Sequence, residues 1–378
     1  MQAAVVEQLS ETAEEGIEGV KVVGDHPPPT APGPDEVVVQ VKAAALNFPD
    51  LLHLTGLYQS KPPLPFVPGS EVAGVVSAVG PGVTSCSVGD RVECRTWLPE
   101  MNDFSEHDSS FPGLGAMASL CKTHAKEIRP IPPGLSFDEA AGVYLGSVPR
   151  FPTPLPPLCS QVTARPDGVP GRRYATAWNS LINRGGLTGS DTLLITGAAG
   201  GMGLAALDVA KNVMGCRVIC AAGSDAKCQT LLELGADEVV NYSDEPRFSR
   251  TVKGWAGGDG VTAVFDVVGG DVLSECVRCV APFAKLLLIG FTAGQANNIN
   301  ANFVLVKALT VIGTGSWSEE EREEAGRQIS GWAERGLIRP QVSHRFPLTT
   351  DGVQSALGAM NSRQAVGKIV VCPDEARL

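Results

Sequence analysis

The sequence predicts an α/β protein that combines a β-rich domain with a doubly wound parallel sheet. Three observations point to this fold class: β-branched runs divided by proline and glycine up to residue 140, alternating strand and helix patterns from about residue 190, and a glycine-rich turn where the alternation begins. The chain has 378 residues, which exceeds the usual size of one domain, so two domains are expected.

The first part of the chain is predicted to be mostly β-sheet. Residues 36–42 (EVVVQVK) and 72–79 (VAGVVSAV) are β-branched runs, and Gly89-Asp90 is typical of a hairpin turn. Asp50, which follows a proline and precedes two leucines, is also typical of a helix start. Asp50 therefore has two interpretations, a turn or cap role and a role in chemistry, and both stay open at this point.

The part after residue 190 alternates between strands and helices. Helices are expected at 203–214 and 225–234, each followed by a glycine that ends it. Strands are expected at 192–196, 217–222, 239–240, 263–268, 285–289 and 309–312. This succession is typical of a parallel, doubly wound sheet.

A further helix is predicted to start at Ser318, because Ser318 and Glu321 have the spacing of a capping box, and to end at Gly336. Residues 367–371 (GKIVV) return to a strand pattern. Residues 317–378 are therefore expected to complete the domain of residues 1–146, while residues 174–316 form the doubly wound domain.

Residues 147–173 fit neither pattern. Seven prolines in these 27 residues exclude a helix or a central strand, and so long an irregular loop is unusual inside a compact domain. We expect this segment to protrude or to be disordered. Residues 96–112, which depart less from the two patterns, are expected to do the same. A further hypothesis is that residues 147–173 come from an unspliced or misannotated stretch, which sequencing of the mature transcript would test.

Charge and apolar content disfavour several kinds of partner. Acidic residues outnumber basic ones 41 to 30, and a formal charge of −11 disfavours nucleic-acid and anionic membrane surfaces. No apolar run reaches the roughly 18 residues of a membrane span, and the first 16 residues carry four glutamates and no lysine or arginine, unlike a targeting peptide. The ten cysteines are scattered, so reduced, packed thiols and a cytoplasmic location are expected. Cys276 and Cys279 lack the second pair that a structural zinc site requires.

The most informative segment is a glycine-rich turn between a strand and a helix. Gly200 would let the backbone approach a diphosphate, Gly203 would let the helix pack on the strand, and the helix start would offer free N–H groups. The predicted cofactor-binding residues of this turn are Ala198, Gly200, Gly201, Met202 and Gly203. A tight turn without a ligand is the alternative, and the strand and helix on either side argue against it.

The end of the next strand predicts which dinucleotide binds. An NAD site expects an acidic residue there for the ribose 2′-hydroxyl, whereas this chain has an uncharged segment with Ser224 and, one turn later, Lys227. These residues favour the 2′-phosphate of NADPH, although they are also compatible with a helix cap and a solvated charge. Asp225 lies one place late for an NAD site and keeps NADH as the less favoured alternative.

With these segments in view, the chain resembles a medium-chain dehydrogenase/reductase, and within that superfamily the zinc-independent quinone oxidoreductase branch. The resemblance covers nearly the whole chain except residues 96–112 and 147–173. The motifs that carry it are Asn47-Phe-Pro-Asp50 with Gly56-Leu-Tyr58, Pro68-Gly69-Ser70-Glu71-Val-Ala-Gly74, Val88-Gly89-Asp90-Arg91-Val92, Gly197-Ala-Ala-Gly-Gly-Met-Gly203, Leu234-Gly-Ala-Asp237 with Asn241-Tyr242, Asp266-Val-Val-Gly-Gly270 and Gly367-Lys-Ile-Val-Val371. The resemblance implies a GroES-like catalytic domain, a Rossmann domain and a homodimer.

The resemblance also implies roles for particular residues. Asn47, Asp50 and Tyr58 would line the substrate side, and Asn47 or Tyr58 would donate a hydrogen bond to the acceptor oxygen. Several relatives carry a second tyrosine where this chain has Leu52, which suggests a more apolar acceptor. The residues implied to contact the adenosine phosphate are Lys227 and Tyr242, and those implied near the nicotinamide ribose are Gly290, Phe291 and Thr292, with core packing as the alternative for Phe291.

No metal is expected. Zinc-dependent relatives have a cysteine where Asn47 stands and a histidine where Ser70 stands, and neither amide nor hydroxyl replaces those ligands well. The cysteine cluster of their second zinc site is reduced here to Cys94.

The function that follows is an NADPH-dependent oxidoreductase that transfers hydride to quinones or α,β-unsaturated carbonyls. Two alternatives stay open: a zinc-free enoyl-thioester reductase and a non-catalytic NADPH-binding protein, because fold alone does not decide activity. The acceptor and the face of hydride transfer are not predicted.

Overall fold

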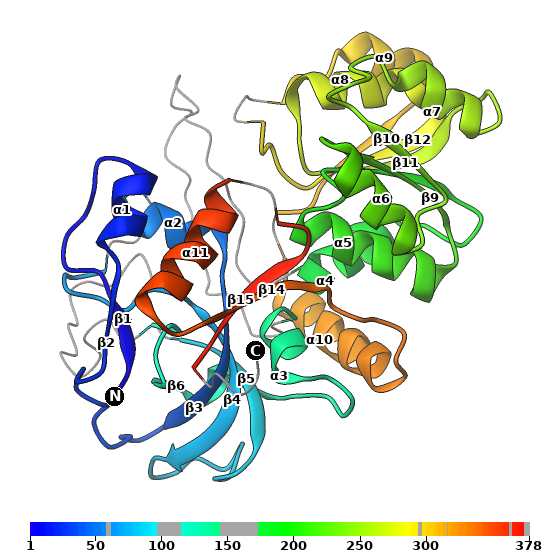
Figure 1. Ribbon diagram of the computed structural model, residues 1–378. Coiled ribbons are helices and arrows are strands. Elements are labelled where there is room, and N and C mark those ends of the chain that lie inside the picture. Colours follow the sequence, from blue (N-terminus) through cyan, green and yellow to red (C-terminus); the bar gives the residue numbers. More distant parts are fainter. Residues whose placement is uncertain are drawn as a thin grey trace. The chain divides into compact units, whose positions relative to one another are not determined.

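The computed structural model describes residues 1–57, 62–96, 115–143, 173–293, 297–315, 317–362 and 365–373, which form two compact units (Figure 1). Among the described residues, the first unit contains those up to residue 143 and those from Pro340 onward, and the second unit contains Arg173–Arg339. Tyr58 and the predicted insertion, apart from Arg173, lie outside the described residues.

The first unit is built on a seven-stranded sheet. Its strands follow the order β14-β15-β3-β4-β5-β7, and β6 also pairs with β3. Their bounds are β3 (Glu36–Ala45), β4 (Glu71–Val79), β5 (Arg91–Arg95), β6 (Leu120–His124), β7 (Ile128–Pro130), β14 (Val342–Pro347) and β15 (Lys368–Cys372), with β1 (Ala3–Val5) and β2 (Lys21–Val23) in a separate antiparallel pair. β15 pairs antiparallel with β3, with Val371 opposite Ala44, so the strand predicted near the end of the chain does join the N-terminal sheet.

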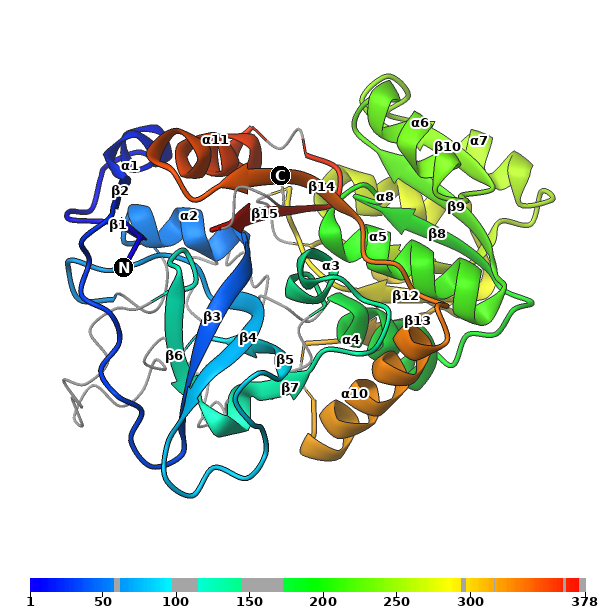
Figure 2. The same ribbon diagram turned by 60° about the horizontal axis from the view of Figure 1, so that its bottom comes forward.

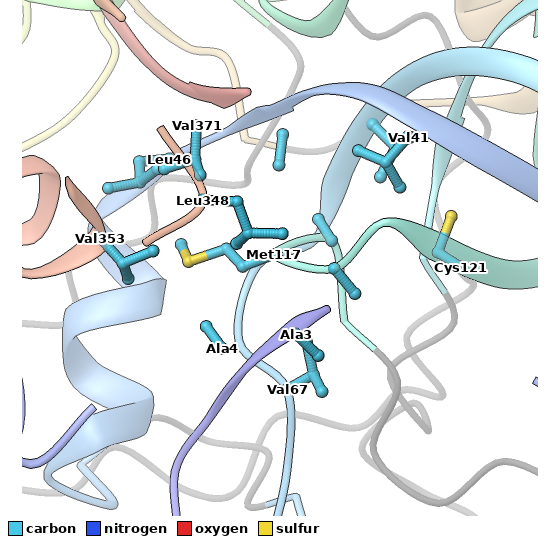
Figure 3. Close-up of a cluster of buried hydrophobic side chains, with 14 of the residues drawn as sticks. Ala3, Ala4, Val41, Leu46, Val67, Met117, Cys121, Leu348, Val353 and Val371 are labelled. Atoms are coloured by element: carbon cyan, nitrogen blue, oxygen red, sulfur yellow. The ribbon is translucent and has the colours of Figure 1, made fainter. Parts of the chain in front are cut away.

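Short helices and one apolar cluster complete the first unit. The helices are α1 (Ala13–Gly19), α2 (Phe48–Leu54), the 3₁₀ turn η1 (Ala125–Glu127), α3 (Phe137–Ala141) and α11 (Thr350–Asn361). Figure 3 shows Leu46, Met117, Leu348 and Val371 meeting in the core, and each of these side chains is buried. Residues separated by more than 200 positions therefore share one core, and removing their apolar surface from water stabilises the pairing of β15 with β3.

The second unit contains a six-stranded sheet in which all neighbouring strands run parallel, in the order β10-β9-β8-β11-β12-β13. The strand order reverses between β8 and β11, where doubly wound sheets bind their ligands. The bounds are β8 (Thr192–Thr196), β9 (Arg217–Ala222), β10 (Glu238–Asn241), β11 (Val261–Asp266), β12 (Val280–Leu288) and β13 (Thr310–Gly313). The α/β fold class that the sequence predicts is confirmed.

Helices cover both faces of this sheet. Figure 1 shows α5 and α6 below the strands of this unit and α7 and α8 above them, and Figure 2 shows the same helices from another side. The helices α7 and α8 contact each other. The bounds are α4 (Arg173–Trp178), the π-helical turn η2 (Asn179–Arg184), α5 (Gly201–Asp208), the π-helical turn η3 (Val209–Met214), α6 (Asp225–Glu233), α7 (Ser249–Trp255), α8 (Gly270–Cys279), α9 (Ala301–Lys307) and α10 (Glu319–Glu334).

Several predicted boundaries differ from the structure; the strand predicted at 285–289, for example, is the longer β12, and the helix predicted at 203–214 is divided into α5 and η3. The strand predicted at 263–268 ends at Asp266, because the backbone N–H of Val267 donates to the Thr196 hydroxyl at 3.0 Å rather than to a ladder partner. The helix that begins after Ser318 lies in the second unit, although residues 317–378 were expected to complete the first.

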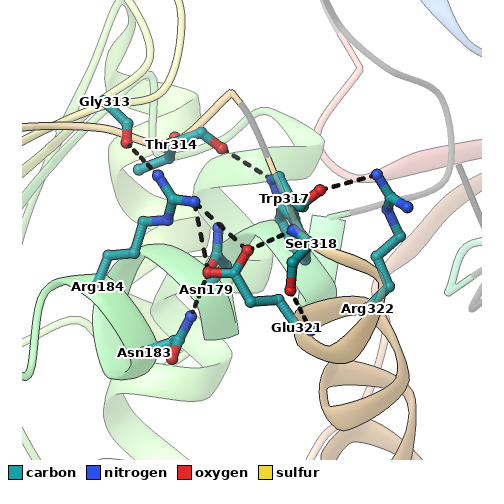
Figure 4. A network of polar contacts seen from close by, with 9 residues as sticks. All are labelled: Asn179, Asn183, Arg184, Gly313, Thr314, Trp317, Ser318, Glu321 and Arg322. Carbon is teal, nitrogen blue, oxygen red and sulfur yellow. Dashed lines mark hydrogen bonds and ion pairs between the residues drawn. The ribbon is translucent and has the colours of Figure 1, made fainter. Parts of the chain in front are cut away.

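A polar network explains the place of α10 (Figure 4). Glu321, the third residue of this helix, accepts hydrogen bonds from the N–H of the cap residue Ser318 at 2.6 Å and from Asn183 Nδ2 at 3.0 Å. Arg184 donates to the Gly313 carbonyl at 3.2 Å and forms an ion pair with Glu321 at 3.4 Å. The start of α10 is therefore tied to η2 and to the end of β13, which both belong to the second unit.

The cysteines that the structure describes are buried thiols: Cys86, Cys94, Cys121, Cys216, Cys220, Cys228, Cys276, Cys279 and Cys372. Burial raises the pKa of the Cys276 and Cys279 thiols, which keeps both in the neutral form that suits packing. Within the described ranges, none of the helices has the length and apolar character needed to cross a membrane.

Candidate active site

The glycine-rich turn of the second unit has the geometry that the sequence predicts. β8 ends at Thr196, Gly197 adopts a positive φ of 57°, and α5 begins at Gly201 with Gly200 as its cap. The N–H of Gly200 donates to the Gly197 carbonyl at 3.0 Å, which closes the turn. The first N–H groups of α5 lack helical acceptors, as at every helix start, and they offer a cradle for an anion.

Gly203 is the position in this turn that tolerates no side chain. A Cβ on Gly203 would lie 2.4 Å from Ala198 Cα and 2.6 Å from the Ala198 carbonyl oxygen. Ala198 itself is fully buried. The helix therefore packs directly on the backbone of the turn, which is the role that the motif assigns to its last glycine.

Arg173 adds a positive charge to the start of α5. A Cβ on Gly201 would lie 2.7 Å from both Nε and one terminal nitrogen of Arg173, so the guanidinium lies against the Gly201 backbone. Sequence reasoning placed Arg173 in the predicted insertion and gave it no role. No local pattern identifies this arginine, because only the packing of α4 on α5 brings it to the turn.

Ser224, Lys227 and Tyr242 gather where β9 and β10 end. Ser224 is the cap residue of α6, but its side chain makes no capping hydrogen bond, and Lys227 is half-buried in the first turn of that helix. A Cβ on Gly223 would lie 3.3 Å from the Tyr242 hydroxyl oxygen, so this ring covers the end of β9. Asp225, the residue that keeps NADH as an alternative, accepts a hydrogen bond from Asn241 Nδ2 at 3.0 Å.

Gly290, Phe291 and Thr292 follow β12 and lie beside the loop after β11. The N–H of Thr292 donates to the Val267 carbonyl at 3.1 Å, and Phe291 is half-buried. The loop after β11 is fixed by Thr196, whose hydroxyl donates to Asp266 Oδ1 at 2.6 Å. The predicted cofactor residues thus lie at the carboxyl ends of β8, β9, β10 and β12, at one edge of one sheet.

In the first unit, Asn47 and Asp50 lie at the start of α2. Asn47 is the cap residue, and its backbone N–H donates to Asp50 Oδ2 at 2.7 Å. This contact is one half of a capping box, so the structural interpretation of Asp50 has direct support. Asp50 is 1% exposed, and burial is the main cause that raises its pKa to about 7.

The Asn47 side chain is held by a buried ion pair from two distant strands. Lys368 Nζ at the start of β15 donates to Asn47 Oδ1 at 2.7 Å and to Glu71 Oε2 at the start of β4 at 2.9 Å. Lys368 and Glu71 are 2% and 1% exposed. Both residues belong to sequence motifs, but no role was predicted for either, because nothing in the sequence places residues 71 and 368 together.

Several polar atoms around this ion pair are buried and have no hydrogen-bond partner within the described part of the chain. They are Asn47 Nδ2, Asp50 Oδ1, Ser70 Oγ and Glu71 Oε1. Buried polar groups in native proteins are almost always hydrogen-bonded, so such a group of atoms in one place is typical of a site that receives a polar ligand. His53, one helical turn after Asp50, is also buried, and desolvation lowers its pKa to about 4.

Comparison with known proteins identifies the family. A family model described as alcohol dehydrogenase GroES-like domain matches residues 33–133, and one described as zinc-binding dehydrogenase matches residues 201–330. Quinone oxidoreductase-like protein 2 of Mus musculus is 32% identical over 348 residues, which cover 91% of this chain and 86% of that protein. Quinone oxidoreductase of Pseudomonas aeruginosa is 31% identical, with 91% and 93% covered. The chain belongs to the quinone oxidoreductase-like branch of the medium-chain dehydrogenase/reductase superfamily.

Solved structures of this superfamily agree with the fold. The quinone oxidoreductase of Escherichia coli, solved in complex with NADPH, matches with a TM-score of 0.73 and 26% identity, and the match covers 99% of this chain and 100% of that one. A 2-haloacrylate reductase matches with a TM-score of 0.71 and 26% identity, covering 99% and 100%. The family and fold class predicted from sequence are confirmed, and the chain is an oxidoreductase of this superfamily.

The side chains at the zinc position of this superfamily do not fit a zinc ion. Asn47 and Ser70 offer an amide and a hydroxyl, which are poor zinc ligands. The ammonium of Lys368 lies 2.7 Å from Asn47 Oδ1, so a metal ion bound there would face a positive charge. Among the described residues, no group of three or more histidine, cysteine, aspartate or glutamate side chains is placed to hold a metal.

Proposed function

We propose that this oxidoreductase uses NADPH to reduce quinones or α,β-unsaturated carbonyls, and that it works without zinc. The observation that carries the proposal is the polar edge of the second-unit sheet, where the glycine turn, Arg173, Ser224 and Lys227 follow the ends of neighbouring strands. Relatives named quinone oxidoreductase and 2-haloacrylate reductase, and a matching structure in complex with NADPH, support the same function.

The second unit would hold the cofactor through its backbone and three positive or polar side chains. The N–H groups at the start of α5 and the guanidinium of Arg173 would bind the diphosphate. Ser224 and Lys227 would bind the 2′-phosphate, with Tyr242 beside them. Gly290, Phe291 and Thr292 would lie near the nicotinamide ribose. Bound NADPH supplies hydride to the acceptor.

The first unit would orient the acceptor and stabilise its charge. As hydride arrives, negative charge develops on the acceptor oxygen, and a fixed hydrogen-bond donor in a dry site stabilises that charge. Asn47 Nδ2 is such a donor, since it is buried and has no partner among the described residues. Asp50 would hold the Asn47 backbone, and Tyr58 stays a predicted second donor. We further propose that the protein is a homodimer in the cytoplasm.

The test is a screen of the purified full chain for oxidation of NADPH, with NADH in parallel. The acceptors are a set of quinones, enones, enals and enoyl thioesters, and cofactor binding is measured separately by fluorescence titration. We expect turnover of quinones or enones with NADPH preferred. Preference for enoyl thioesters would favour the thioester reductase, and saturable NADPH binding without turnover of any acceptor would favour the non-catalytic alternative.

A further inference from the structure

The buried ion pair of Lys368 and Glu71 fixes the orientation of the Asn47 side chain. β3 lies between β4 and β15 in the sheet, and Ala45 of β3 is opposite both Glu71 and Val370. This pairing brings Lys368 and Glu71 to the end of β3, two residues before Asn47. The contacts of the ion pair therefore depend on the sheet register rather than on a mobile loop.

Lys368 determines the orientation of the Asn47 side-chain amide. An ammonium group has only donors, so the atom that Lys368 contacts at 2.7 Å must be the amide oxygen, Oδ1. The amide nitrogen then points away from Lys368 with both of its hydrogens. That nitrogen, Nδ2, is buried and has no acceptor within the described residues. A donor held in this way is ready for an oxygen that comes from outside the protein.

The backbone around Asn47 is fixed as well. The Asn47 N–H donates to Asp50 Oδ2 at 2.7 Å, and the N–H of Leu46 donates to the Ile369 carbonyl at 3.0 Å. The residue before Asn47 is thus bonded to the residue after Lys368. Both partners of the amide–ammonium contact are held by neighbouring main-chain bonds, which reduces the reorganisation needed when an oxyanion develops.

The charge of Lys368 has a further effect on the amide. A cation bonded to Oδ1 withdraws electron density from the amide, and hydrogen bonds in a chain strengthen one another, so the Nδ2 hydrogens become better donors. Glu71 accepts from the same ammonium at 2.9 Å and balances its charge in the buried site.

The geometry points to Lys368 and Glu71 as positioning residues that hold Asn47 Nδ2 toward the acceptor oxygen and strengthen it as a donor. This inference rests on the proposed function and deepens it: the acceptor is a molecule with a carbonyl oxygen that gains negative charge, and Asn47 touches that oxygen. In this role Lys368 acts through Asn47, whose oxygen it contacts.

A second buried ion pair in the same sheet offers a matched control. Lys122 Nζ lies 2.9 Å from Glu36 Oε2, and these side chains are 1% and 13% exposed. The pair Lys368 and Glu71 has the same separation, and its side chains, taken without the backbone, are 3% and 1% exposed. The double variants Lys368→Met/Glu71→Gln and Lys122→Met/Glu36→Gln each remove one buried pair without leaving a lone charge, and thermal denaturation compares their stability.

The first readout is a kinetic cycle on the full chain with NADPH and the best acceptor. Lys368→Met/Glu71→Gln should lower kcat by about 100-fold, as expected when a catalytic group loses its position, with little change in the dissociation constant for NADPH. The same change made on an Asn47→Ala background should lower kcat little further, because the residue through which it acts is gone. Lys122→Met/Glu36→Gln should leave kcat unchanged. Two results would overturn the inference. One is that Lys368→Met/Glu71→Gln lowers kcat no more than this control does. The other is that it lowers kcat on the Asn47→Ala background as much as it does in the otherwise unsubstituted chain.

The second readout does not depend on turnover. 4-Nitrophenolate carries the charge that the acceptor oxygen develops, and its absorbance reports binding to the full chain in the presence of NADP⁺. The affinity for 4-nitrophenolate should fall in Asn47→Ala and in Lys368→Met/Glu71→Gln but not in Lys122→Met/Glu36→Gln. Equal affinity in these three variants and the unsubstituted chain would overturn the inference. If phenolate binding follows the expected order while every acceptor fails to be reduced, the proposed function falls and the donor role of Asn47 stands.

Discussion

The glycine turn of the second unit and the polar cluster of the first unit are built in opposite ways. The turn consists of consecutive residues from Thr196 to Gly203, and its contacts are mainly made by the backbone. The cluster joins side chains at positions 47, 71 and 368, which come from a helix cap and two strands. A site made by the backbone depends on the absence of side chains, whereas a site made by side chains depends on the register of a sheet.

The largest expected effect concerns the turn. In Gly203→Ala the new Cβ would lie 2.4 to 2.7 Å from three backbone atoms of Ala198, which cannot move aside as a side chain can. We expect the variant to lose saturable NADPH binding, measured by fluorescence titration. Gly201→Ala should be milder, because the clashing group is the flexible side chain of Arg173.

Gly254→Ala is the matched control for this comparison. Gly254 lies in α7, and a Cβ there would meet nothing within 4 Å. It should bind NADPH like the unsubstituted chain and be slightly more stable, since alanine favours a helix. Unchanged NADPH binding in Gly203→Ala would contradict the role of this glycine.

The glycine turn and the polar cluster also differ in how far they can be predicted from the sequence. The turn, the strand ends that hold Ser224 and Tyr242, and the capping box at Ser318 are local patterns, and the structure has the corresponding elements at those positions. Asn47 and Asp50 were found through a family motif. The contact of Lys368 with Asn47 was not predicted, because it depends on the pairing of β15 with β3. Arg173 was missed for the same reason, as its position depends on helix packing.

The second prediction concerns the polar cluster, where two buried groups should make stability depend on pH in opposite directions. Burial raises the pKa of Asp50 to about 7, so the folded state binds its proton more tightly and loses stability as the pH rises from about 4 to 7. Burial lowers the pKa of His53 to about 4, so the folded state loses stability as the pH falls from about 6.5 to 4. The two slopes oppose each other in the unsubstituted chain.

Single variants should separate these slopes. Relative to the unsubstituted chain, Asp50→Asn should gain stability as the pH rises from about 4 to 7, by roughly 3 to 4 kcal/mol in total. Relative to the same chain, His53→Gln should lose stability as the pH rises from about 4 to 6.5. The measurement is the free energy of unfolding in urea at a series of pH values. Asp50→Asn retains an oxygen that can accept from the Asn47 N–H, so the cap is kept. Parallel pH curves for both variants would show that neither group titrates as its burial implies.

The smallest expected effect concerns the choice of cofactor. Lys227→Ala should reduce the preference for NADPH over NADH by about tenfold, the size of one charge-assisted hydrogen bond at a half-exposed site. The ratio of the two dissociation constants is the measurement. Lys253→Ala, on the exposed side of α7, removes the same charge elsewhere in the unit and should leave that ratio unchanged. An equal loss of affinity for both cofactors in Lys227→Ala would assign this lysine to the diphosphate instead.

The position of β15 in the chain has a consequence for synthesis on the ribosome. The strand that carries Lys368 is translated only after the whole second unit, so β3 emerges long before the partner that lies beside its end. The nascent first unit therefore exposes one side of β3 and part of its apolar core while the second unit is already able to fold. Chaperones that recognise apolar nascent segments would be expected to bind during this interval. A chain that stops before β15 would keep the fold of its second unit, while the side chain of Asn47 lacked the ammonium that contacts its oxygen.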